Sequence, residues 1–195
     1  MRVRRFAPQA YAVIGALVLA AAWPVITLAQ EHSHPSQRES VVDHKNGASA
    51  LIKVVREVTE RFKDVSVAEA EEYYLNFGCV SGSDSGAMGM HFVNMGLVGD
   101  GEIDATRPEI VIYEPLPNGK LRLIGADYLV LASQWDATHD APPQLMGQLF
   151  HLFESPNRFG LPAFYTLHVW AWKDNPSGAF VNWHPKVSCD AFAGR

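Results

Sequence analysis

Two β-rich runs on either side of Asn118-Gly119 constrain the fold of this chain more than any other feature. The runs are residues 109–117 (EIVIYEPLP) and 120–132 (KLRLIGADYLVLA), and β-branched or aromatic residues recur through both. Asn-Gly between two such runs is the strongest short-range indication of a β-hairpin. The sequence therefore predicts an antiparallel strand pair in the middle of the chain.

A two-residue turn at this dipeptide fixes which residues of the hairpin face each other. Counting outward from the turn gives three pairs: Glu114 with Leu123, Ile112 with Gly125 and Ile110 with Asp127. Because side chains alternate along a strand, Asp127 falls on one face of the pair and Glu109 on the other. Both faces are otherwise largely apolar, so the pair is predicted to be covered on both sides or to line a barrel.

Helices are expected before the hairpin and further strands around it. Residues 48–63 place apolar side chains on one helical face, and Ser66-Val67-Ala68-Glu69 forms a capping box for a second helix that ends near residue 75. Strands are expected at 88–94, 163–173 and 183–189, whereas 144–153 fits a short helix or a strand. The predicted fold class is α+β, with two N-terminal helices followed by an antiparallel sheet that can curl into a small β-barrel.

The first 29 residues have the form of a cleavable export signal. Three arginines precede the apolar stretch 11–22, Pro24 interrupts it, and Thr27-Leu28-Ala29 supplies small residues for cleavage. The alternative is an uncleaved membrane anchor, but the shortness of the apolar stretch favours cleavage. We therefore expect a signal peptide over 1–29, a flexible tail over 30–47 and a single domain over 48–195. The mature protein would be periplasmic or secreted, with no stable membrane anchor.

The net charge and the cysteine content bear on the partners of the protein and on the role of its cysteines. The net charge of the chain is −5, and loss of a leader with three arginines takes it to −8. That sign argues against nucleic acid as a partner. The two cysteines, Cys79 and Cys189, are an even number in an exported chain, which favours a structural disulfide over a catalytic thiol.

Several phrases of the sequence resemble a family of exported bacterial single-domain proteins that has no established function. They are residues 89–94 (GMHFVN), 167–172 (LHVWAW), 175–180 (NPSGAF) and 183–189 (WHPKVSC). The resemblance spans roughly residues 54–189. It implies export and a single domain bracketed by the two cysteines, and it implies no activity.

Two histidines lie inside expected strands, and each must find a hydrogen-bond partner or a metal there. They are His91 and His168, and the interior acids Asp127 and Glu109 could complete a site as third ligand or as an orienting group. Two histidines and one carboxylate can bind zinc or non-haem iron, and copper is a further transition-metal candidate. The competing interpretation is a pair of core histidines with ordinary hydrogen-bond partners, because no short-spaced ligand motif is present.

Aromatic residues are concentrated in the second half of the chain. Four of them, in the expected strands, are candidates for the lining of a pocket: Tyr113, Tyr128, Trp170 and Trp172. Such a pocket would take a small apolar or aromatic ligand, although aromatic residues also fill ordinary cores. The sequence alone thus favours an exported small-molecule-binding module, with a metalloprotein as the alternative. No complete catalytic motif appears, so the sequence does not decide whether the protein is an enzyme.

Overall fold

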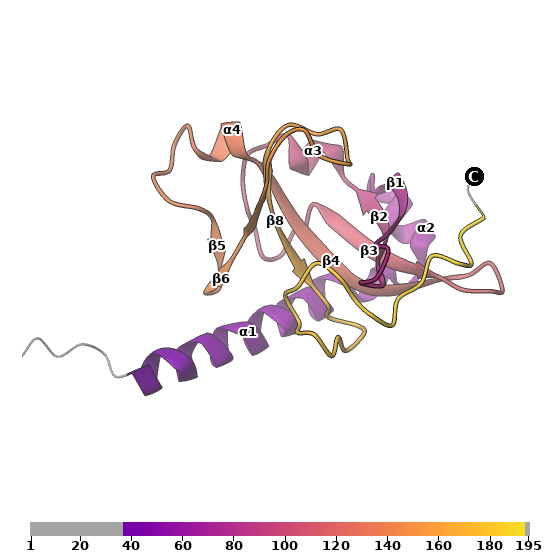
Figure 1. The fold of residues 1–195 in the computed structure, drawn as a ribbon, viewed down its shortest axis with the longest axis horizontal. Helices are drawn as coiled ribbons and strands as arrows, with labels where there is room; N and C mark the ends of the chain where they lie inside the picture. The colour runs from indigo at the N-terminus through magenta and orange to yellow at the C-terminus, as the bar shows by residue number, and fades with distance from the viewer. Residues whose placement is uncertain (1–36, 194–195) are drawn as a thin grey trace, which may run out of the picture. The chain divides into compact units, whose positions relative to one another are not determined.

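The computed structural model describes residues 37–193, with side chains described from residue 46 onward. Its centre is a six-stranded sheet in the order β1-β2-β3-β4-β8-β7, with every neighbouring pair antiparallel. The sheet curls (Figure 1). The expected α+β class with a curled antiparallel sheet is confirmed. The predicted signal peptide lies outside the described residues.

Three helical segments precede the sheet: α1 (Gln37–Thr59), the 3-10 turn η1 (Glu60–Lys63) and α2 (Val65–Ala70). Helix α1 begins before residue 48, so residues 37–47 of the expected tail are helical. Helix α2 is capped by Asp64, whose Oδ1 accepts from the Ser66 backbone N–H at 3.0 Å. The predicted capping box at Ser66 was therefore wrong, because the acid two residues earlier reaches the free N–H groups first.

The strands of the main sheet are β1 (Tyr74–Ser81), β2 (Ala87–Val93), β3 (Ile110–Pro115), β4 (Leu121–Leu131), β7 (His151–Phe153) and β8 (Phe164–Val169). Two one-turn helices, α3 (Met95–Val98) and α4 (Ala132–Trp135), lie in the connections. Strands β2 and β8 confirm the expected ones, although β8 ends at Val169 rather than residue 173. Residues 183–189 form no strand, only a single bridge between Ala87 and His184.

The β3–β4 hairpin exists, but its turn is one residue longer than predicted. The Leu116 N–H donates to the Lys120 carbonyl, and Gly119 has a positive φ of 76°. This is a three-residue loop with glycine in the left-handed position. Close to the turn Glu114 therefore pairs with Arg122, not with Leu123. A bulge after Ile112 restores the predicted register, so the Ile110–Asp127 and Ile112–Gly125 pairs are confirmed.

Residues 144–153 fold as strands, which corrects the helix alternative. Strands β5 (Gln144–Leu145) and β6 (Gln148–Leu149) form a small hairpin of their own. Its turn residues Met146 and Gly147 both have positive φ, which suits a tight two-residue hairpin turn and not a helix. Strand β1 was also missed, because the sequence placed its first residues in α2 and its last in a loop.

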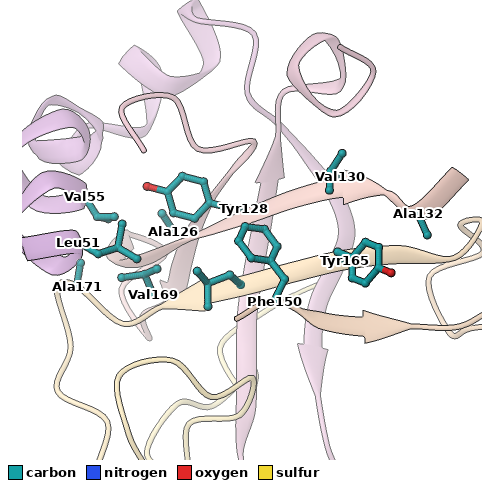
Figure 2. Packing of buried hydrophobic residues seen from close by; sticks show 11 residues of the cluster. Leu51, Val55, Ala126, Tyr128, Val130, Ala132, Phe150, Tyr165, Val169 and Ala171 are labelled. Carbon is teal, nitrogen blue, oxygen red and sulfur yellow. The ribbon is translucent and has the colours of Figure 1, made fainter. Parts of the chain in front are cut away.

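The two faces of the sheet are covered differently. On one face, Leu51 and Val55 of α1 pack with Ala126 and Val169, as Figure 2 shows. The other face packs against the C-terminal loops, which contribute buried residues such as Trp170 and Val187. Helices therefore shield one side, while the candidate site forms on the other.

A disulfide joins Cys79 of β1 to Cys189 near the C-terminus, as predicted. The bond indicates an oxidising location outside the cytoplasm. Within residues 37–193, no helix has both the length and the apolar character needed to cross a membrane.

Candidate metal centre

His91, Asp127 and His168 meet on the sheet face opposite the helices. Asp127 and His168 are direct partners across the β4–β8 pair, and His91 comes from β2, with β3 between. Each residue offers one ligand atom, and the three atoms lie within 4.8 Å of one another. All three residues are 3% exposed. The histidine pair expected from the sequence thus lies together with one of the two expected acids.

The two imidazoles face each other through their Nε2 atoms, which are 3.4 Å apart. The Nδ1 atom of His91 lies 3.2 Å from the Gly89 carbonyl. Because a carbonyl can only accept, Nδ1 of His91 carries the proton and Nε2 presents its lone pair to His168. This tautomer is the one in which a histidine coordinates a metal through Nε2.

His168 lacks a comparable partner. Its Nδ1 lies 3.4 Å from Asp127 Oδ1, but the orientation makes no hydrogen bond, and this buried nitrogen is unsatisfied among the described residues. With its proton on Nδ1, its Nε2 lone pair would point at that of His91. Two lone pairs at 3.4 Å are complementary to a cation between them. With its proton on Nε2, His168 instead donates to His91, as in an ordinary core pair.

Asp127 is held by one short hydrogen bond. The Thr166 hydroxyl, itself buried, donates to Asp127 Oδ1 at 2.5 Å. No Lys or Arg of the described part of the chain forms an ion pair with this carboxylate. A buried carboxylate without a cation beside it is costly, and a bound metal ion would supply the missing charge.

Burial governs the protonation of the cluster. Desolvation, and then the neighbouring His168, lowers the pKa of His91 to about 4. Desolvation, and then His151, lowers the pKa of His168 to about 3. Burial raises the pKa of Asp127 to about 6. Both imidazoles are therefore neutral at pH 7, which is the form that binds metals.

The cluster borders a cavity of about 20 Å³, which is room for one water or one ion. All six strands of the main sheet contribute to its wall. Apart from the cluster and Thr166, the wall is apolar and includes four phenylalanines: Phe77, Phe153, Phe159 and Phe164. The volume is far below the roughly 300 Å³ at which pockets for drug-sized ligands begin.

Glu109, the other expected acid, does not join the cluster. Its neighbour Ile110 lines the cavity, so strand alternation directs Glu109 to the opposite side. There its Oε2 accepts from the Leu129 N–H at 3.0 Å, and burial raises its pKa to about 8. Glu109 is thus a buried structural acid in this fold.

The four aromatic residues proposed for a ligand pocket lie in the packed cores and do not line this cavity. Tyr113 donates to the Phe62 carbonyl and Tyr128 to the Ala105 carbonyl, both at 2.7 Å. Trp170 and Trp172 also use their indole N–H groups, toward the Val181 carbonyl and the Thr59 hydroxyl. Each ring is anchored by its polar end, as core aromatics usually are.

Two features of the site escaped sequence reasoning. Thr166 lies two residues before His168 and therefore shares its face of the strand. Strand alternation alone could have identified it as a neighbour of the site. Phe77 belongs to an irregularity of β1 that no sequence pattern indicated.

Comparison of the chain with known protein families, curated proteins and solved structures found no match.

Proposed function

We propose that this protein is a periplasmic or secreted metalloprotein in which His91, His168 and Asp127 hold one divalent transition-metal ion. The Nε2–Nε2 distance of 3.4 Å carries the proposal. Two nitrogens bound to a tetrahedral zinc ion at about 2.05 Å each would be about 3.3 Å apart. The histidines therefore already have the separation that a metal requires.

The roles of the other groups follow from this arrangement. Asp127 is the third ligand, since its carboxylate offers an oxygen within 4.8 Å of a ring nitrogen of each histidine. Thr166 and the Gly89 carbonyl orient two of the ligands through hydrogen bonds. Three protein ligands leave a coordination position open to the cavity, as in catalytic zinc and non-haem iron sites.

Two observations support a periplasmic or secreted location for the protein. The disulfide favours an oxidising compartment, and the N-terminal residues have the pattern of an export signal.

Elemental analysis of the mature protein, purified without a histidine tag or a chelator, tests the proposal. We expect one zinc, iron or copper ion per chain, and loss of that ion in His91→Ala/His168→Ala. The control is His139→Ala, which removes an exposed histidine outside the cluster and should retain the ion. Asp127→Asn keeps the side-chain shape and should weaken binding in a folded protein. A wild type that stays metal-free after incubation with all three ions would sink the proposal.

A further inference from the structure

The cavity wall determines which molecules can reach the proposed ion, and this inference rests on the proposed function. Four phenylalanine rings form a continuous series. Phe77 contacts Phe159 with ring centroids 5.5 Å apart, and Phe159 contacts both Phe153 and Phe164 at 6.0 Å. Phe164 is buried, Phe153 and Phe159 are half-buried, and Phe77 is 40% exposed. The series thus runs from solvent to the cavity.

Phe77 occupies its position because β1 is irregular there. Asn76 pairs with His91 and Cys79 pairs with Met90, so Phe77 and Gly78 are extra residues bulged out of the strand. Phe77 has φ of 64°, a left-handed conformation that bulky side chains rarely adopt. An exposed aromatic ring in an unfavourable backbone conformation beside a cavity is typical of a functional position.

The lining offers polar groups only at the proposed metal centre. Beyond His91, His168, Asp127 and Thr166, every lining residue is apolar, and none of the lining residues is Lys or Arg. An anion would therefore meet a buried carboxylate and no compensating positive side chain. A molecule held here is recognised by size, apolar surface and a bond to the metal.

From these observations we infer that the open metal position receives a small, neutral, apolar molecule of about the size of dioxygen, and that Phe77 controls its access. A larger ligand has no room in a 20 Å³ cavity, and a charged one would lose its hydration along the apolar lining without a side-chain partner there. The phenylalanine series also excludes bulk water from the path between solvent and the histidines.

Dissolved dioxygen tests the inference in the metal-free protein, because it is paramagnetic and enhances the relaxation of nearby methyl groups. With methyl-labelled protein under oxygen pressure, we expect enhancement at Met88, Leu129 and Leu161, which line the cavity. Leu51 and Val55, fully buried in the other core, serve as references. Azide, a small anion, should leave the cavity methyl shifts unchanged. Equal enhancement at cavity and reference methyls, or a clear azide response, would overturn the inference.

A variant pair isolates the role of Phe77. Phe77→Asn suits the left-handed backbone, removes the ring and should reduce the dioxygen effect by admitting water. Leu152→Asn is the matched control, because Leu152 is similarly exposed at 49% but does not line the cavity. Identical behaviour of the two variants would refute the access role. Because every arm uses metal-free protein, absence of metal binding, measured separately, counts against the proposed function and not against this selectivity.

Discussion

Thr166→Val should weaken metal binding although Thr166 is not a ligand. The substitution replaces a hydroxyl by a methyl of similar size at a site that is 1% exposed. It removes the 2.5 Å hydrogen bond that orients Asp127. Loss of such an orienting partner lowers metal affinity by about 10- to 100-fold, or about 1.4 to 2.7 kcal/mol. We expect an effect of this size on zinc.

The assay is competition for zinc against a chromophoric chelator at constant pH, with urea unfolding of the metal-free protein in parallel. Thr166→Ser is the control, because it retains the hydroxyl and should bind zinc almost as the wild type does. In the metal-free state, Thr166→Val should also cost about 1.5 to 3 kcal/mol, since a buried hydrogen bond to a charged group is lost.

Unchanged zinc affinity in a folded Thr166→Val protein would refute the reasoning, because Asp127 would then not depend on Thr166 for its position. An equal loss in Thr166→Ser would point to packing at this site and not to the hydroxyl. Either result would leave the histidines as ligands but remove Asp127 from the centre as described.

Two further predictions concern stability. Cys79→Ala/Cys189→Ala opens a loop with a sequence separation of 110 residues, so urea unfolding should show a loss of about 4.8 kcal/mol in the chain-entropy treatment; a loss below the error of the measurement would contradict a structural role. Glu109 has a folded-state pKa raised by burial from 4.5 to about 8, so the folded state holds this proton more tightly than the unfolded state. The contribution of this bound proton to the free energy of unfolding is fully present below pH 4.5 and is lost as pH rises to 8. Its size is on the order of 3 to 5 kcal/mol. Glu109→Gln should remove this decline when unfolding is measured across that pH range, and an unchanged pH profile would contradict the assignment.

The sequence predicted the hairpin and the histidine-bearing strands because their signals are local. Alternation along β2 and β8 is visible in consecutive residues, and it placed His91 and His168 in strand interiors. The Ile110–Asp127 pair was predicted correctly, although the turn geometry assumed for it was wrong. The turn is one residue longer than assumed, and the bulge after Ile112 compensates for it. Neither feature could be deduced from the Asn-Gly dipeptide alone.

Long-range pairing lay beyond the sequence. Nothing local shows that β8 joins the sheet beside β4, yet this pairing sets His168 opposite Asp127. The positions of the aromatic residues depend on the fold in the same way. Composition reveals how many rings a core contains, but only the fold decides that Phe77 borders the cavity while Tyr113 and Tyr128 bond to backbone carbonyls.

The cluster of His91, Asp127 and His168 is costly to bury, and this cost favours a binding role. Burial of two imidazoles and a carboxylate in a sheet face that is otherwise apolar opposes folding. The contacts of the Thr166 hydroxyl, the Gly89 carbonyl and the two Nε2 atoms with one another recover only part of that cost. Apolar residues of similar volume would pack there at less expense. The cluster would become favourable if a cation joined the two Nε2 atoms and balanced Asp127, because the groups that are poorly satisfied in isolation would then all be engaged. A bound ion should therefore stabilise the folded state, and the stability of this domain should depend on metal concentration.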